Sequence, residues 1–151
     1  MENIKVRKIN REDSKRIWEI RNHPLMRRNS NNQEETPFEK HDPWFENKYF
    51  KAGGNHCFVL ENEEKVIGYC RFDFDNNSDN YVVSIAVDAD YQGKGLGNSF
   101  LEEALKAFNA REKEVVAQTF KNNIPSGKIF RKNNFEIYKE DDNSYYFKLK
   151  K

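Results

Sequence analysis

The sequence predicts an α+β domain with a central, mainly antiparallel sheet that is flanked by helices. Three observations support this prediction: several short stretches of alternating or β-branched residues, two well-marked helix starts, and a length of 151 residues, which suits one domain with one core. We therefore expect a single domain over residues 1–151.

The chain is predicted to begin with an edge strand and a helix. Ile4–Ile9 mostly alternates between apolar and charged residues, which is typical of an edge strand. Asn10, with Asp13 three residues later, has the pattern of a capping box, in which each side chain satisfies a backbone N–H group of the other residue. The helix that follows carries Ile17, Trp18 and Ile20.

A second helix start lies at Thr36-Pro37-Phe38-Glu39, where a cap residue, a proline in the first turn and an acid follow one another. Proline lacks a backbone N–H group and its ring clashes with the preceding turn of a helix. Pro43 is therefore expected to interrupt this helix, by a kink or by a restart at Asp42.

The middle of the chain is predicted to form strands. Phe58–Glu61 and Lys65–Phe74 suit a hairpin, and Tyr81–Val87 is rich in β-branched residues. A tight turn at residues 62–65 would place Cys57 opposite Cys70. An oxidised pair is one alternative there, but a reducing cytoplasm favours two buried apolar thiols.

The last part alternates helices and strands. From Leu96 the apolar residues follow helical spacing, and Glu114–Phe120 returns to a strand. Ser126–Lys132 suits a short helix that ends at Asn133-Asn134, because asparagine tolerates the left-handed conformation of a helix end. Two closing strands are expected at Phe135–Lys139 and Tyr145–Leu149.

The composition bounds the function. Charged residues make up 34% of the chain and nearly cancel, leaving a formal net charge of +1, so no global field for nucleic acid is expected. The sequence has neither a signal-peptide pattern nor an apolar run long enough to span a membrane. It also lacks Cys/His spacings typical of metal sites. We expect a cytoplasmic protein without a metal, with no nucleic acid or membrane partner.

The most informative segment is the glycine-rich stretch Gln92-Gly93-Lys94-Gly95-Leu96-Gly97-Asn98, between a predicted strand and a predicted helix. Glycines allow sharp turns and close approach of the backbone to a ligand. The first turn of the helix offers unpaired N–H groups and a partial positive charge, which suit a pyrophosphate. Lys94 adds a full charge.

Two better-known phosphate motifs do not fit this segment. The GK[ST] ending of a nucleoside-triphosphatase loop is absent, and the third glycine of a dinucleotide fingerprint is missing. One alternative remains open at this point, namely a glycine-rich turn that only permits tight packing of the strand against the helix.

Two segments together resemble the GCN5-related N-acetyltransferase (GNAT) superfamily. Residues 92–97 are similar to its Q/R-x-x-G-x-G/A motif, and residues 123–135 resemble its N-x-x-[SA]-x-x-x-[YF]-x-x-x-G-F segment, with Asn134 in the place of the glycine. The resemblance implies a GNAT-like mixed sheet that splays at its middle strands, with a bulge in the strand Ser84–Val87. It also implies direct transfer of an acetyl group from acetyl-CoA to a primary amine.

The resemblance implies roles for particular residues. The pantetheine arm would pair with the backbone near Ile85 and Val87, as an added strand does. The N–H groups from Gly93 to Asn98 would hold the pyrophosphate, and Asn123 the pantetheine amide. A backbone N–H near Val87 would stabilise the oxyanion. The full set of cofactor-binding candidates is Ile85, Ala86, Val87, Gln92, Gly93, Lys94, Gly95, Leu96, Gly97, Asn98, Asn123, Ser126 and Phe130.

The catalytic candidates are His41, Ser84, Val87 and Ser126. Many members of the superfamily have a tyrosine that protonates the leaving thiolate, whereas this chain has Phe130, which has no proton to give. A thiol has a pKa of about 8.5 and leaves readily, so solvent or Ser126 suffices in this interpretation. The alternative is a domain that binds the cofactor without catalysis.

The N-terminal third resembles the subgroup that acetylates the 4-amino group of nucleotide-linked amino sugars, as in pseudaminic-acid synthesis. The resemblance lies in residues 17–24, 41–45 and 134–141. Arg21, Arg27 or Arg28 would hold the diphosphate, and Trp44 or Phe45 would stack on a base or sugar. His41 would take the proton of the amine, directly or through water. The substrate-binding candidates are Arg21, Asn22, His41, Trp44 and Phe45.

Structural roles compete with these assignments, because the aromatic residues also suit a core, His41 a structural position and the arginines a solvated face. Three functions are therefore compared: an amino-sugar N-acetyltransferase, an N-acetyltransferase for a protein N-terminus, polyamine or aminoglycoside, and a non-catalytic acyl-CoA-binding module. The arginines would attract an anionic acceptor, which favours the first over a polyamine enzyme.

Overall fold

The computed structural model describes residues 3–109 and 112–150, so residues 1–2, 110–111 and 151 of the predicted domain lie outside the described residues. The strands are β1 (Ile4–Lys8), β2 (His56–Asn62), β3 (Lys65–Asp75), β4 (Asn80–Val87), β5 (Glu114–Phe120), β6 (Phe135–Glu140) and β7 (Ser144–Leu149). The α-helices are α1 (Ser14–Asn22), α2 (Pro24–Arg28), α3 (Phe38–Glu46), α4 (Leu96–Phe108) and α5 (Ile124–Lys132). Short helical turns occupy Arg11–Asp13, Asn47–Lys51 and Ala89–Tyr91.

The seven strands form one sheet in the order β1-β2-β3-β4-β5-β7-β6. Every neighbouring pair is antiparallel except β4 and β5, which run parallel. The predicted α+β class with a mixed, mainly antiparallel sheet is thus confirmed, and β1 is an edge strand as expected.

The sheet opens between its two parallel strands. β4 pairs with β5 only over Asn80–Val82 and Glu114–Val116, and the remainder of each strand is unpaired on that side. The predicted bulge in Ser84–Val87 is wrong, because β3 and β4 pair in an unbroken register from Asp75↔Asn80 to Gly68↔Val87. The opening therefore follows from the short β4–β5 ladder, and β4 stays paired with β3 along its whole length.

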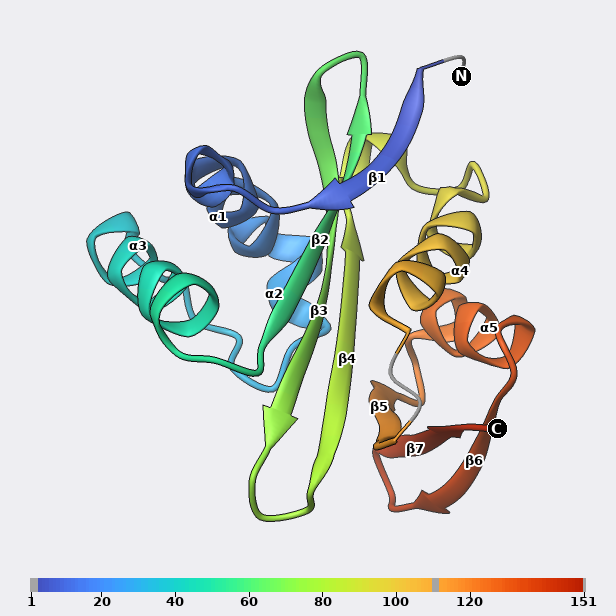
Figure 1. Cartoon of the computed structure of the whole chain (residues 1–151). Coiled ribbons are helices and arrows are strands. Elements are labelled where there is room, and N and C mark those ends of the chain that lie inside the picture. The colour runs from blue at the N-terminus through green and yellow to red at the C-terminus, as the bar shows by residue number, and fades with distance from the viewer. Residues whose placement is uncertain (1–2, 110–111, 151) are drawn as a thin grey trace.

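Helices cover both faces of the sheet. In Figure 1, α1, α2 and α3 lie on one side of β2, β3 and β4, and α4 and α5 lie on the other. Because side chains alternate along a strand, β2 supplies both cores. Phe58 belongs to the same core as Phe100 of α4, whereas Val59 belongs to the core that contains Ile17 of α1. This double burial explains why the central strands read as nearly continuous apolar runs.

The hairpin of β2 and β3 has a one-residue irregularity that moves the cysteines. Glu61 pairs with Val66 but Leu60 pairs with Gly68, so the register skips Ile67. Cys57 therefore lies opposite Arg71, and the prediction that it faces Cys70 is wrong. Cys57 belongs to the core beneath α1 and α3, whereas Cys70 belongs to the core beneath α4. Both are free and buried, as the favoured interpretation expected.

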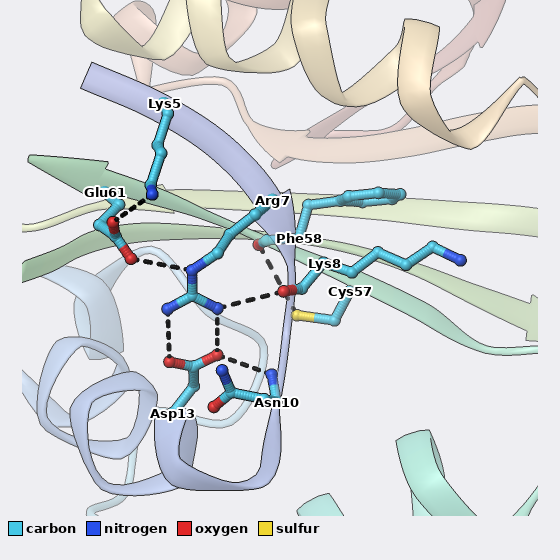
Figure 2. A network of polar contacts seen from close by, with 8 residues as sticks. All are labelled: Lys5, Arg7, Lys8, Asn10, Asp13, Cys57, Phe58 and Glu61. Carbon is cyan, nitrogen blue, oxygen red and sulfur yellow. Dashed lines mark hydrogen bonds and ion pairs between the residues drawn. The ribbon is translucent and has the colours of Figure 1, made fainter. Parts of the chain in front are cut away.

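A polar network joins β1, β2 and the start of α1 (Figure 2). The Arg7 guanidinium donates two hydrogen bonds to Asp13, of 2.8 and 2.9 Å, and one of 2.8 Å to Glu61. The hydrogen bond from Arg7 lowers the pKa of Glu61. The backbone N–H of Asn10 donates to Asp13 at 2.8 Å, so the capping box is confirmed, with a short 3₁₀ turn before the helix.

Two helices begin within two residues of their predicted starts. α3 begins at Phe38, with Pro37 and not Thr36 in the cap position, and it continues through Pro43 to Glu46. α5 begins at Ile124, two residues before the predicted Ser126. The predicted interruption is wrong, since one missing N–H group is tolerated where buried residues such as His41 and Phe45 hold the helix on the core. Asn134 has a φ of 68°, which confirms the predicted left-handed end after α5. Among the described residues, no helix is long and apolar enough to cross a membrane.

Candidate functional site

A cleft of about 1120 Å³ lies where β4 and β5 separate. We call the side formed by β4, the 92–98 loop, β5 and α5 the donor half, and the side formed by α1, α2, the 29–36 segment, Trp44, Tyr69 and Arg71 the acceptor half. Residues of the donor half that line it include Ser84, Ile85, Ala86, Val87, Gln92, Gly93, Gly95, Leu96, Gly97, Asn98, Thr119, Asn123, Ser126 and Phe130.

The 92–98 loop is fixed to the sheet at its entry. The backbone N–H of Asp88 donates to the carbonyl of Ile67 at 2.7 Å, and the Gln92 side chain donates to the carbonyl of Val87 at 2.9 Å. Arg16 bonds the carbonyl of Val66 at 2.8 Å and forms an ion pair with Asp88. The irregularity at Ile67 thus provides one of the anchors that hold the loop at the end of β4.

The glycines of the loop serve two different purposes. Gly93 and Gly95 have φ angles of 78° and 77°, which favour glycine, and a Cβ atom at either would meet nothing within 4 Å. A Cβ at Gly97 would lie 2.6 Å from Cδ1 of Ile129. Gly97 therefore leaves room for the Ile129 side chain where α4 meets α5. This is a packing role between two helices, whereas the nearest strand atom, Cγ2 of Val87, would lie 4.0 Å from the added Cβ.

The backbone N–H groups of Gly93–Gly97 make no hydrogen bond within the described part of the chain. Those in the first turn of α4 lack intrahelical partners, as at every helix N-terminus. They lie at the positive end of a 13-residue helix and beside the cleft. This arrangement fits the pyrophosphate of coenzyme A.

Other candidates of the donor half have mixed surroundings. Asn123 caps α5 and lines the cleft with Ser126, whereas the Asn98 side chain accepts a 2.9 Å hydrogen bond from Asn133 and ties α4 to α5. Phe130 borders the cleft and packs on Phe135 and Phe147, at ring distances of 5.1 and 5.6 Å. Lys94 does not line the cleft, and its Nζ lies 5.6 Å from the ring of Tyr91.

Sequence reasoning missed Thr119 of β5. Its Oγ1 is buried and has no hydrogen-bond partner among the described residues, although it lines the cleft. Extending the register from Val82↔Val116 sets Thr119 across the gap from Ile85. Buried polar groups are normally paired, so an orphaned hydroxyl here is a second feature that fits a polar ligand lying between β4 and β5.

The acceptor half is built around one tryptophan. The guanidinium carbons of Arg21 and Arg71 lie 5.0 and 5.5 Å from the Trp44 ring centroid, and Lys48 Nζ lies 5.3 Å from it. Arg71 and Tyr69 of β3 were not predicted. One charged residue within a largely apolar strand forms no recognisable sequence motif. Arg71 joins the acceptor half only because the folded chain places β3 beside α1 and the Arg71 guanidinium beside Trp44 of α3.

His41 and Phe45 do not line the cleft. Both are buried, with His41 fully so. Nε2 of His41 contacts the carbonyl of Ser14 at 3.0 Å, and Nδ1 contacts Arg21 Nη1 at 3.2 Å. Because a carbonyl only accepts and a guanidinium only donates, these contacts assign the neutral tautomer with hydrogen on Nε2. Burial, followed by the charge of Arg21, lowers the pKa of His41 to about 4.

Asn22 and the other arginines have largely structural partners. The Asn22 side chain exchanges two hydrogen bonds with the backbone of Thr36, at 2.7 and 2.9 Å, and so fixes the segment before α3. Arg27 donates to the carbonyl of Asn22 at 3.0 Å, and Arg28 is exposed at the border of the cleft. Of the predicted acceptor residues, Arg21, Arg28 and Trp44 line the cleft with accessible polar or aromatic surface, and the Arg21 guanidinium packs on the Trp44 ring.

A sheet that opens beside a helix N-terminus, with a glycine-rich loop between them, is the arrangement that the resemblance to the N-acetyltransferase superfamily implied, a class of enzymes that use an acyl-CoA donor. The sequence places the chain within it: residues 15–135 match the acetyltransferase (GNAT) family, so the chain belongs to this family. The prediction of an acyl-CoA-dependent N-acetyltransferase is confirmed at this level.

Particular relatives cover nearly the whole chain. Acetyltransferase PseH from Campylobacter jejuni is 28% identical over 145 residues, covering 94% of this chain and 88% of that protein. The structure of C. jejuni PseH in complex with acetyl coenzyme A has a TM-score of 0.69 at 24% identity and covers 98% of this chain and 99% of that one. The structure of yncA from Salmonella typhimurium with its cofactor acetyl-CoA has a TM-score of 0.83 at 22% identity, and covers 98% of this chain and 94% of that one.

Proposed function

We propose that the chain transfers an acetyl group directly from acetyl-CoA to a primary amine, and that this amine is the 4-amino group of a nucleotide-linked amino sugar. The observation that carries the proposal is one cleft that joins an unpaired backbone N–H cradle to an arginine and tryptophan cluster. The resemblance of residues 17–24 and 41–45 to the amino-sugar subgroup, together with the match to PseH, supports the finer assignment. A cytoplasmic location remains part of the proposal.

The donor half supplies the contacts for acetyl-CoA. The N–H groups of Gly93–Gly97 would hold the pyrophosphate, and the unpaired edge of β4 from Val83 to Val87 would bond the pantetheine arm. Asn123 would bond a pantetheine amide. A backbone N–H near Val87 would stabilise the oxyanion that forms when the amine attacks the thioester.

Proton transfer in this proposal uses groups other than Phe130. Ser126 lines the donor half and is half-buried, so it or water would donate to the leaving thiolate. The structure gives His41 no direct access to the amine, because its two ring nitrogens bond Ser14 and Arg21. The positive cluster itself favours the neutral, nucleophilic form of a nearby amine, since like charges disfavour an ammonium group.

The competing acceptors suit the cleft less well. A polyamine requires acidic side chains, and among the described residues that line the cleft Glu34 is the one acid, against arginines at positions 21, 27, 28 and 71. A purely acyl-CoA-binding module would not require an acceptor half that opens into the same cleft. The sequence match to the acetyltransferase family likewise favours catalysis.

A thiol-release assay tests this function. Purified protein and acetyl-CoA are combined with nucleotide-linked 4-amino sugars, polyamines, aminoglycosides and peptide N-termini, and free coenzyme A is measured with a thiol reagent. We expect turnover with the amino sugar at a kcat/KM at least about tenfold above that of the other amines. Tight coenzyme A binding without turnover of any amine would leave the binding module as the function, and faster turnover of a polyamine would replace the acceptor class.

A further inference from the structure

We infer that Arg21, Trp44 and Arg71 form one subsite that binds a phosphate group of the acceptor. This phosphate subsite lies about one sugar ring away from the reacting nitrogen. This inference rests on the proposed function and assigns a role to Arg71, which neither the sequence motifs nor the donor half explain.

The donors of Arg71 are largely unused. Its Nε is buried without a hydrogen-bond partner among the described residues, and its Nη1 lies 3.8 Å from Asp73, beyond hydrogen-bonding distance. Asp73 already accepts a 2.8 Å hydrogen bond from Tyr49 and lies 3.3 Å from Lys48. Arg71 is thus held beside a shared carboxylate, with donors left for a ligand in the cleft.

Arg21 is oriented but not neutralised. Its Nη1 donates to His41 Nδ1 at 3.2 Å, and within the described chain no carboxylate lies within ion-pair distance of it. Burial lowers the pKa of Arg21, and the charge of Arg71 adds to this effect. Neutral His41 therefore acts as a positioning residue that fixes the guanidinium without cancelling its charge.

The cluster has a surplus of positive charge. Arg21, Lys48 and Arg71 surround Trp44, and Asp73 is the one carboxylate within 4 Å of any of them among the described residues. Like charges held out of water repel one another, and an anion that accepts bonds from two guanidinium groups relieves this cost. Guanidinium donors also match phosphate oxygens in pairs, and the Trp44 ring holds both groups by cation–π contact.

The position of Arg71 along the sheet favours a phosphate over a carboxylate as the anionic group of the acceptor. Arg71 pairs with Ser84 on β4, three residues before Val87, where the proposed oxyanion contact lies. At about 3.3 Å per residue this is roughly 10 Å along the strand. The carboxylate of an α-amino acid lies two bonds from its nitrogen, which is too short a span, whereas the phosphate of a glycosyl phosphate lies across the sugar ring from a 4-amino group.

Isothermal titration of the coenzyme A-saturated protein tests the subsite, because bound coenzyme A blocks the pyrophosphate cradle of the donor half. The probes are uridine diphosphate, uridine, inorganic phosphate and glutamate. We expect uridine diphosphate to bind at least about tenfold more tightly than uridine, with added salt reducing the difference. Inorganic phosphate should compete with it, and glutamate should not.

Three variants test whether Arg71 itself causes the tighter binding of uridine diphosphate. Arg71→Met should weaken uridine diphosphate by at least about tenfold while leaving uridine and coenzyme A affinities unchanged, and Arg71→Lys should restore part of the loss. Arg11→Met, which removes an exposed arginine that does not line the cleft, should change the affinity less than about twofold. Each variant is used only where its melting temperature shows a folded protein.

The outcomes separate this inference from the proposed function. Equal losses in Arg71→Met and Arg11→Met would show diffuse charge attraction and overturn the subsite. Glutamate binding that exceeds uridine diphosphate binding, or uridine diphosphate binding that survives the removal of Arg71, would also overturn it. Loss of coenzyme A binding by the unmodified protein would instead contradict the proposed function, and the subsite would be judged from the uridine diphosphate titration alone.

Discussion

The two halves of the cleft are built by different means. The donor half presents backbone: the N–H groups of Gly93–Gly97 and the free edge of β4, all within one continuous stretch of chain. The acceptor half presents side chains: Arg21 from α1, Trp44 from α3 and Arg71 from β3, which only the fold brings together. A backbone site needs particular conformations and therefore leaves a local motif, whereas a side-chain site leaves scattered residues that no spacing rule connects.

The largest expected effect comes from placing a charge in the donor half at Gly95. Its φ of 77° is accessible to asparagine and aspartate, and a side chain there has open space. A carboxylate about 6 Å from the pyrophosphate would cost roughly 3 kcal/mol at an effective dielectric near 20, or about a hundredfold in affinity. We expect this loss of coenzyme A affinity in Gly95→Asp, measured by calorimetry.

Gly95→Asn is the matched control for this variant. It has nearly the same size and backbone preference without the charge, so its coenzyme A affinity should fall by less than about fivefold. Equal affinities for the two variants would mean that no anion sits beside the loop. That result would remove the proposed cradle and the contrast between the two halves.

The next effect separates packing from binding within the donor half. The Cβ of Gly97→Ala would meet Ile129 Cδ1, so the variant should lower the free energy of unfolding by about 1 kcal/mol. Ile129→Val removes that atom, and in its background the same change should be neutral or stabilising, because alanine favours a helix over glycine by about 1 kcal/mol. Urea unfolding of the four proteins measures the coupling. Additive changes would show that α4 and α5 do not meet closely at Gly97.

The smallest effect concerns His41 behind the acceptor half. The pKa of His41 is about 4 in the folded protein, against an ordinary value of 6.5. Between these two pH values the unfolded chain therefore binds a proton at His41 that the folded protein does not bind. The contribution of this group to stability is nearly complete above pH 6.5 and falls as the pH drops toward 4, by about 0.8 kcal/mol at pH 6.0. His41→Gln should lose this dependence, as measured by unfolding at pH 7.5 and 6.0.

The same variant distinguishes a positioning role from direct proton transfer. Glutamine can accept from Arg21 and donate to the Ser14 carbonyl, so we expect a turnover rate within about tenfold of the natural enzyme across pH 6 to 9. A much larger loss that grows as the pH falls would return His41 to the role of a base.

The sequence was sufficient for most of the fold and for the donor half. Helix caps at Asn10 and Asn134, the apolar face of α4 and the strand near Tyr81 depend on neighbours a few residues away, and all lie where the patterns indicated. The loop was identifiable because its function depends on glycines at fixed spacing.

The errors arose where distant parts of the chain decide the outcome. Pro43 stays within α3 because the helix is packed on the core, and Ile67 leaves the β2–β3 register where its carbonyl bonds Asp88. The burial of His41 beneath Arg21 and the approach of Arg71 to Trp44 also depend on tertiary packing. None of these has a pattern of its own in the sequence.

The skipped residue in the β2–β3 hairpin has one more consequence. Because it sends Cys57 and Cys70 to opposite layers, and burial raises the pKa of both thiols, neither reacts with an alkylating reagent until its own layer opens. The two modification rates therefore report separately on the loosening of the layer that carries Arg21 and of the layer beneath α4. Comparing the two rates with and without each ligand would show whether acceptor and cofactor suppress local opening in the same layer or in different layers.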